Sequence, residues 1–196
     1  MRSIVINREF GSGGREVGRL VAEQAGLRFY DSRIIQDAAT AKGLSPGMLE
    51  RFDERISTNP FVSIAVFAGV DPETSSMPYR LYSAIQDVVV GAARTAPAVF
   101  VGRCADKILA DAGIPFRSVF VYSTDLERKI QRAVEVDGVA RKSAEGYIAT
   151  MDRTRSRYQQ FFTDTTFGDY REYDICLNSA RLSFAECANV ILATVG

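Results

Sequence analysis

The stretch that decides the fold is Ile4-Val5-Ile6-Asn7-Arg8-Glu9-Phe10-Gly11-Ser12-Gly13-Gly14-Arg15-Glu16-Val17-Gly18. Its apolar run, residues 4–6, predicts a buried strand, and the apolar positions from Val17 onward follow the spacing of a helix. The glycines between them predict a turn in which an anion can reach the backbone amides without a Cβ in the way. The next helix presents its free N–H groups and positive dipole end to the same anion. The stretch therefore predicts a phosphate cradle.

This turn departs from the usual phosphate-loop pattern, G-x-x-x-x-G-K-[ST]. With Gly13 as the second glycine, the first falls on Arg8, the lysine on Gly14 and the hydroxyl residue on Arg15. Arg15 keeps a positive charge with several donors, so we predict that it replaces the lysine. Arg8 is the weaker candidate, because it precedes the glycines and its side chain is free to point outward. A tight turn without a ligand is the alternative. The residues predicted to bind donor phosphates are Gly11, Ser12, Gly13, Gly14, Arg15 and Glu16.

Composition narrows the class of protein. The chain has 196 residues, 46% of them hydrophobic and 24% charged, which is typical of one globular domain with a sizeable core. Lys+Arg and Asp+Glu are equal at 24 each, so no overall field favours a nucleic acid or a membrane as partner. The absence of histidine excludes histidine-based triads and removes the commonest metal ligand.

Cysteine placement and apolar run lengths indicate the compartment. Cys104, Cys176 and Cys187 lie far apart without a C-x-x-C motif, so we interpret them as reduced, buried residues. No N-terminal signal is visible, and the longest apolar stretch, residues 61–70, is about half of what a membrane span needs. We therefore expect a cytoplasmic protein.

Short apolar strands alternate with helices along the chain. Strands are expected at residues 4–6, 27–30, 98–101, 118–122 and 173–177. Helices are expected after each of them, with further helices over 45–56 and 79–94. This alternation predicts an α/β fold with a five-stranded parallel sheet and helices on both faces. Ligands bind at the carboxyl ends of such strands, so Asp31 after the second strand and Arg103 after the third become candidate site residues.

Residues 57–80 are the least regular part of the chain. Asn59-Pro60, Asp71-Pro72 and Met77-Pro78 punctuate it, around the apolar segment of residues 61–67. An irregular segment with this much apolar surface must cover something. We interpret it as a lobe inserted into a single domain of residues 1–196. The alternative is a contact between the subunits of a homodimer.

Two later helices carry arginines four residues apart. Arg128 and Arg132 share one helix face, as do Arg153 and Arg157, with Arg155 on the opposite side. Like charges at this spacing repel unless an anion lies between them, although a solvated surface is the simpler explanation for either pair alone. Phosphoryl transfer needs many fixed cations around a charge-spread group, so the four arginines together favour that chemistry.

Three segments resemble the cytidylate kinase-like family of nucleoside monophosphate kinase relatives. They are residues 8–16, residues 101–106 and residues 168–178. The resemblance covers nearly the whole chain and implies a P-loop sheet, an acceptor lobe at about 57–80 and a lid at about 126–165. It also implies ATP as donor with Mg²⁺. By the same resemblance, Arg103 and Asp106 would hold the acceptor, while Arg128, Arg132 and the arginines near residue 155 would belong to the lid.

The sequence therefore predicts an ATP-dependent phosphotransferase that acts on a CMP-like nucleoside monophosphate. Asp31, Arg103 and Asp106 are expected to bind the acceptor. Arg15, Arg128, Arg132, Arg153 and Arg157 are expected to act on the transferring phosphoryl group. A non-catalytic nucleotide-binding module is the main alternative, and a kinase of another small molecule is a third. No residue pattern assigns the metal ligands.

Overall fold

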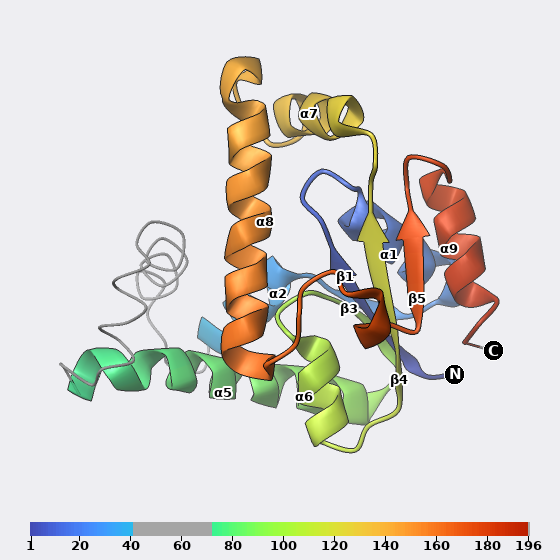
Figure 1. Cartoon of the computed structure of the whole chain (residues 1–196). Helices are drawn as coiled ribbons and strands as arrows, with labels where there is room; N and C mark the ends of the chain where they lie inside the picture. The colour runs from blue at the N-terminus through green and yellow to red at the C-terminus, as the bar shows by residue number, and fades with distance from the viewer. Residues whose placement is uncertain (41–71, 196) are drawn as a thin grey trace.

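A five-stranded parallel sheet forms the centre of the computed structural model, which describes residues 1–40 and 72–195 (Figure 1). Its strand order is β2-β3-β1-β4-β5, so the first strand of the chain lies in the middle of the sheet. Every neighbouring pair is parallel, as predicted. The strands are β1 (Ser3–Arg8), β2 (Arg28–Tyr30), β3 (Ala98–Val101), β4 (Phe116–Tyr122) and β5 (Ile175–Asn178).

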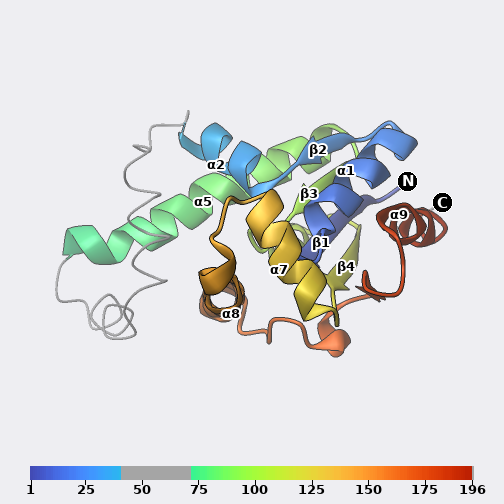
Figure 2. The same ribbon diagram turned by 90° about the horizontal axis from the view of Figure 1, so that it is seen from above.

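Helices connect these strands and cover the sheet on both faces (Figures 1 and 2). They are α1 (Gly14–Ala25), α2 (Ser32–Thr40), α5 (Pro72–Thr95), α6 (Ala105–Asp111), α7 (Leu126–Glu135), α8 (Arg141–Thr163), the short 3₁₀ turn η1 (Tyr170–Glu172) and α9 (Phe184–Leu192). The helix and sheet alternation predicted from the sequence is confirmed over the described residues.

The alternation of side chains along β1 creates two separate cores. Ile4 and Ile6 point to one face and pack with α1 and α9, where Val17 and Ile191 are fully buried. Val5 points to the other face and joins a core built from α2, α5 and α6. Burying each such aliphatic side chain stabilises the fold by roughly 1.5–3 kcal/mol. Because helices of the described ranges cover both faces, a ligand can approach this sheet past the ends of its strands.

Helix α7 stands beyond the carboxyl ends of the strands, and α8 runs from the level of α7 down alongside the sheet (Figure 1). Figure 2 shows α7 lying over the end of β1. A small core anchors the pair there, in which Phe10 from the loop after β1 packs with Ala133 of α7 and with Ala144 and Ile148 of α8. The two helices therefore cover the place where the sequence predicts a ligand.

The helix ends and the expected lobe differ from the sequence-based expectations or lie outside the described residues. The helix expected over residues 79–94 begins earlier, at Pro72, because proline is tolerated in the first turn of a helix. The spacing of Thr124 and Glu127 in the sequence predicts a capping box at the start of α7, but the side chain of Asp125 caps the helix by accepting from the N–H of Arg128. The helix expected over residues 45–56, and residues 57–71 of the expected acceptor lobe and homodimer contact, lie outside the described residues.

Candidate functional site

The loop of residues 9–13 joins β1 to α1, and we call it the glycine loop. Gly11 and Gly13 have φ angles of 74° and 81°, a region that residues with a Cβ rarely adopt. Ser12 is buried, and its hydroxyl donates to the carbonyls of Glu9 (2.9 Å) and Val121 (3.0 Å). Ser12 therefore shapes the loop. Gly13 occupies the N-cap of α1 and provides no side-chain cap, so the first amides of that helix can bind an anion.

Phe184 at the start of α9 lies against this loop. A Cβ added to Gly13 would lie 2.2 Å from Cζ of the Phe184 ring, so only glycine fits there without movement. The guanidinium carbons of Arg128 and Arg132 lie 5.4 Å and 5.0 Å from the centre of the same ring. One aromatic ring therefore joins the glycine loop to the arginines of α7.

Polar contacts of α7 reinforce this link. Arg132 forms an ion pair with Glu16 in the first turn of α1, at 2.6 Å. Arg128 donates to the backbone carbonyl of Ser179, at 2.8 Å. In this conformation the structure brings both predicted lid arginines next to the loop, where they hold α7 against α1 and the segment after β5.

Arg15 points to the end of β2. Its Nε lies 2.7 Å from Oδ2 of Asp31, although most of the arginine side chain is exposed. Burial works to raise the pKa of the Asp31 carboxyl, but the hydrogen bonds from Ile34 N–H and Arg15 outweigh it, so the pKa falls below its ordinary value. The structure thus brings together two predicted site residues, one assigned to the donor and one to the acceptor.

Arg103 and Asp106 follow β3. Arg103 has a φ angle of 57°, unusual for a residue with a side chain, and its guanidinium lies 5.3 Å from the centre of the Tyr158 ring. Asp106 accepts a hydrogen bond from Nδ2 of Asn7, at 2.7 Å. Burial raises the pKa of Asp106 despite the hydrogen bonds it accepts. Asn7, which the sequence did not single out, therefore connects the predicted acceptor site to β1.

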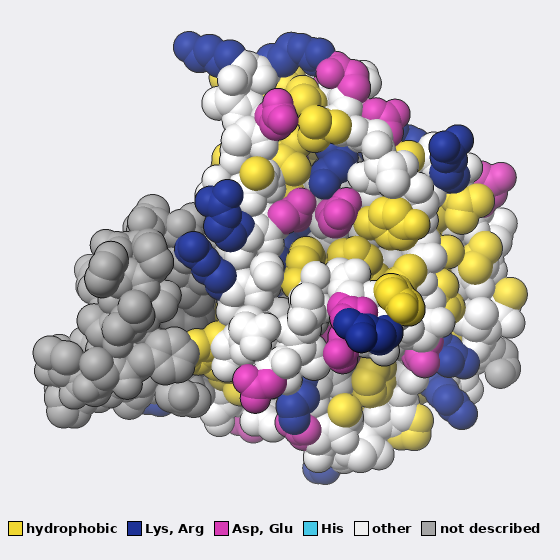
Figure 3. Space-filling view, viewed as in Figure 1, with side chains coloured by type: hydrophobic (Ala, Val, Ile, Leu, Met, Phe, Trp, Pro, Cys, Tyr) yellow, Lys and Arg dark blue, Asp and Glu magenta, His cyan; other side chains and the backbone are white. Residues whose placement is uncertain are grey.

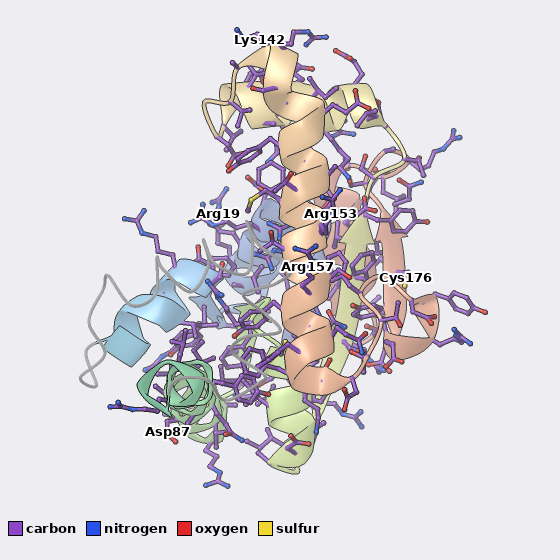
Figure 4. All side chains as sticks on the ribbon, turned by 60° about the vertical axis from the view of Figure 1, so that its left-hand side comes forward. Arg19, Asp87, Lys142, Arg153, Arg157 and Cys176 are labelled. Carbon is purple, nitrogen blue, oxygen red and sulfur yellow. The ribbon has the colours of Figure 1, made fainter. Side chains whose placement is uncertain are left out.

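The arginines of α8 are arranged differently from the sequence-based assignment. Arg153 and Arg157 lie on the side of α8 that faces the viewer in Figure 4, and Arg153 is exposed. Arg155 is the one that reaches the glycine-loop region. Its Nη1 donates to the carbonyl of Arg8 at 3.1 Å, and its guanidinium lies 5.4 Å from the centre of the Phe10 ring. The roles predicted for Arg153 and Arg157 stay predictions, and Arg155 joins the candidate site.

One further residue of the site, the buried Lys129, was not predicted from the sequence. Lys129 of α7 is only 7% exposed, and its Nζ lies 3.2 Å from Glu9 and 3.4 Å from Asp152. Asp152 also accepts from the N–H of Phe10, at 2.6 Å. Figure 3 shows acidic and basic side chains meeting in a hollow beneath α7 and beside α8. Lysine in an amphipathic helix is usually exposed, so no sequence signal marked Lys129.

A metal site is not preformed in the described part of the chain. Within residues 1–40 and 72–195, no three acidic or cysteine side chains gather closely enough to hold an ion. Two carboxylates pair with Lys129: Glu9, which belongs to the glycine loop, and Asp152, which accepts from the N–H of Phe10 in that loop. Over the same ranges, every helix is too short or too polar to span a bilayer.

The geometry now defines the class of protein. A parallel sheet carries a glycine loop and helix N-terminus at its carboxyl edge, with arginines from several elements around it, as kinase-like phosphate-binding folds do. The family comparison agrees, since residues 3–181 match the cytidylate kinase-like family. The chain belongs to this family, which supports a nucleotide kinase-like role. No curated protein matches the sequence.

Solved structures show the same fold. An uncharacterized protein from Eubacterium ventriosum superposes with a TM-score of 0.71 at 25% identity, covering 100% of this chain and 98% of that one. The protein TT1252 from Thermus thermophilus gives 0.58 at 17% identity, with full coverage of both chains. Shikimate kinase from Acinetobacter baumannii, in complex with shikimate, gives 0.52 at 14% identity, covering 100% of this chain and 93% of that one.

Proposed function

We propose that this protein is an ATP-dependent phosphotransferase that moves the γ-phosphoryl group of ATP to a nucleoside monophosphate, with CMP as the first candidate. In that reaction the bond from the γ-phosphorus to its bridging oxygen breaks. A bond to a phosphate oxygen of the acceptor forms, so the products are ADP and a nucleoside diphosphate. We also propose a cytoplasmic location, because all three cysteines are unpaired.

One observation carries this proposal. The uncapped start of α1 and the glycine loop lie among Arg8, Arg103 and Arg155, which come from three different elements. Phosphoryl transfer depends on positioning and charge stabilisation rather than on covalent chemistry by the protein. Fixed guanidinium groups beside free amides supply both, and the reaction needs no histidine.

The remaining site residues receive proposed roles from their positions. The backbone of residues 11–16 would bind the donor phosphates. Arg103, Asp106 and Asp31 lie after β3 and β2, so we assign the acceptor to that side of the loop. Helices α7 and α8, within residues 126–165, would act as the lid that excludes water from the reacting groups.

Magnesium would neutralise phosphate charge when it is bound. Mg²⁺ in such sites is held mainly by substrate phosphates and water, with one or two protein carboxylates. Glu9 and Asp152 fit that requirement, since both offer oxygens beside the glycine loop. Lys129 compensates their charge in the absence of nucleotide and would have to share them with the ion.

The deciding experiment is an ADP-release assay with purified protein, ATP and Mg²⁺ against CMP, dCMP, UMP and AMP. We expect acceptor-dependent turnover, fastest with a cytidine nucleotide, and no turnover when the acceptor is omitted. An Arg155→Gln variant should lose roughly 10²–10³-fold in turnover, as when one charge-stabilising donor is removed. Absence of turnover with every acceptor, in protein that binds ATP, would refute the kinase.

The same outcome would favour the second candidate, a nucleotide-binding module without catalysis. Two ion pairs support this candidate. Arg15 is engaged by Asp31, and Glu16 is engaged by Arg132, so two side chains of the loop region are already occupied. Such a module would bind ATP, tighten the contacts of α7 and release no ADP.

A further inference from the structure

The side chain of Arg8 occupies the space beside Gly14. A Cβ added to Gly14 would lie 2.5 Å from Cβ of Arg8 and 3.0 Å from its Cγ, which is closer than side chains pack. Position 14 can therefore carry no side chain while residue 8 has one, because the closest contact is with Cβ of that residue. In the usual phosphate loop the residue that corresponds to Arg8 is glycine, and the residue that corresponds to Gly14 is the lysine that reaches the terminal phosphates. Here the glycine and the cation have exchanged places.

The far end of Arg8 lies against the turn after β3. A Cβ added to Gly102 would lie 2.1 Å from Nη1 of Arg8, so the guanidinium occupies space that a side chain at residue 102 would take. Gly102 has a φ angle of 78° and donates its N–H to the carbonyl of Ile6. A second glycine thus makes room for Arg8, which is half-buried rather than pointing outward as the sequence suggested.

Within the described part of the chain, the guanidinium of Arg8 has few acceptors around it. Its only hydrogen bond to a described side chain is a long one, 3.5 Å from Nη2 to Oγ of Ser32. Among those side chains no carboxylate lies within ion-pair distance of it, and Asp31, which attracts it from farther away, is paired with Arg15. A guanidinium has five N–H donors and tolerates burial poorly without an anion.

Neighbouring cations make an anionic partner for the Arg8 guanidinium still more favourable. Arg155 donates to the backbone carbonyl of Arg8, at 3.1 Å. Burial first, and then the charges of Arg155 and Arg103, push the pKa of Arg8 well below its ordinary value, and the carboxylates of Asp31 and Asp152 offset only part of this effect. Three guanidinium groups that repel one another at the carboxyl edge of the sheet would be stabilised by a multiply charged oxyanion.

We propose that Arg8 takes the place of the missing loop lysine and binds the terminal phosphoryl group of a nucleoside triphosphate, with Arg155 and Arg103 as supporting cations. This assignment rests on the proposed function, because it names the residue that grips the donor. In this assignment the role of Arg15 is structural, because its side chain pairs with Asp31. A guanidinium can hold two phosphoryl oxygens at once, where an ammonium acts as a point charge.

The exchange can be tested by reversing it. The variants are Arg8→Gln, which keeps the length of the stem without the charge, Arg8→Gly, Gly14→Lys and the double variant Arg8→Gly/Gly14→Lys. Arg19→Ala is the control, because Arg19 lies on the exposed side of α1 in a surface ion pair with Glu23. Calorimetric titration with inorganic triphosphate and with ATP measures binding without requiring turnover, and circular dichroism verifies folding.

We expect Arg8→Gln and Arg8→Gly to weaken triphosphate binding roughly ten- to a hundredfold, because each variant loses hydrogen bonds between charged groups. Gly14→Lys alone should be destabilised by its clash with Arg8. The double variant should regain stability and most of the affinity, while Arg19→Ala binds as the wild type does. Wild-type affinity in folded Arg8→Gln, or a folded double variant no tighter than Arg8→Gly, would overturn the assignment. A wild type that binds no triphosphate would do so too.

Turnover separates this assignment from the proposed function. If triphosphate binding depends on Arg8 but no acceptor supports ADP release, the kinase fails and the role of Arg8 in binding stands. If ADP release proceeds equally in wild type and Arg8→Gln, the kinase stands and the role of Arg8 fails.

Discussion

Arg15 and Asp31 form an ion pair of 2.7 Å that joins the first turn of α1 to the start of α2. Asp31 also accepts from the N–H groups of Arg33 and Ile34, at 3.1 Å and 2.9 Å, and so caps α2. Its carboxylate is 4% exposed and satisfied by three donors. The pair therefore ties two strand ends of the site together and depends on the ionised state of Asp31.

This dependence predicts how stability changes with pH. The pKa of Asp31 is lowered in the folded protein, so its contribution is full above the unfolded pKa of about 3.9 and is lost as pH falls through the folded value. Asp31→Asn keeps a capping side chain but removes the charge. We expect the variant to be less stable than the wild type at pH 7, with the difference shrinking as the pH falls below the ordinary carboxyl pKa of about 3.9.

Urea unfolding at several pH values measures this difference. Asp111→Asn provides the control, since Asp111 forms an exposed ion pair with Lys107 and its substitution should shift stability by less than about 0.5 kcal/mol. A deficit in Asp31→Asn that stays constant between pH 7 and pH 3 would contradict the role given to the charge.

Gly13 and Gly26 form a matched pair for a packing test. Both have positive φ angles, 81° and 65°, so alanine at either position costs about 1–2 kcal/mol of backbone strain. Nothing lies within 4 Å of a Cβ at Gly26, whereas a Cβ at Gly13 meets Phe184. We expect Gly13→Ala to be less stable than Gly26→Ala by a further 1–3 kcal/mol or so, the cost of overpacking.

Thermal unfolding of both variants, alone and with Phe184→Ala, checks this prediction. Removing the ring should bring the two alanine variants close together in stability, because only the backbone strain would remain. If the gap persists without the Phe184 ring, the contact is not its cause.

Lys129 should be one of the most sensitive charged residues of the site. Replacing it with methionine leaves the carboxylates of Glu9 and Asp152 without their shared cation. Breaking a buried pair in this way costs roughly 3–5 kcal/mol, so Lys129→Met should unfold at much lower urea concentration than the wild type. Lys107→Met, which removes an exposed pair of the same type, should cost under about 1 kcal/mol.

The deficit of Lys129→Met should also depend on pH. Burial raises the pKa of Asp152 even with Lys129 present, and loss of the lysine should raise it further. When the pKa of a carboxyl is higher in the folded protein than in the unfolded chain, the folded protein is more stable at low pH. It loses that stability as the pH rises through the pKa of the folded state. The variant should therefore recover part of its stability as the pH is lowered towards the ordinary carboxyl pKa of about 3.9, and a deficit independent of pH would argue against unpaired negative charge as its cause.

Hydrogen exchange tests the lid. The link between α7 and α8 turns at Gly138, with φ 69°, and residues 135–138 are exposed. The segment after α8 is held instead by side chains, with Gln159 and Thr163 both bonded to Thr165. We expect amides of residues 136–140 to exchange much faster than those of β1 and β4, and residues 163–168 to be intermediate. ATP should slow exchange at 136–140, and slow exchange there without nucleotide would contradict a moving lid.

Much of the fold follows from local patterns. The apolar runs at residues 4–6, 98–101 and 118–122 marked strands buried on both faces, and all three lie inside β1, β3 and β4. Strand order was not predictable, because it depends on which strands meet after the chain has crossed over the sheet. The capping of α7 was misassigned by one residue, since Asp125 and Thr124 are both good caps and only the backbone geometry selects between them.

The candidate site was predicted less completely than the fold. Helical spacing correctly paired Arg153 with Arg157 and placed Arg155 opposite them, but spacing alone cannot say which face of a helix meets the sheet. Packing decided that Arg155 faces inward, because Ala144 and Ile148 anchor α8 over Phe10. Lys129 and Asn7 were missed for the same reason, as their importance lies in partners distant in sequence.

By itself the sequence determined the α/β class, the glycine loop between the first strand and first helix, and membership of a kinase-like family. These features depend on residue types at short spacings, which set backbone conformation locally. The tertiary structure alone decided where the cations of the loop point: Arg15 to Asp31, and Arg8 into the space that Gly14 and Gly102 leave open. A long side chain can swing several ångströms from its Cα, so its direction is set by the neighbours that leave it room.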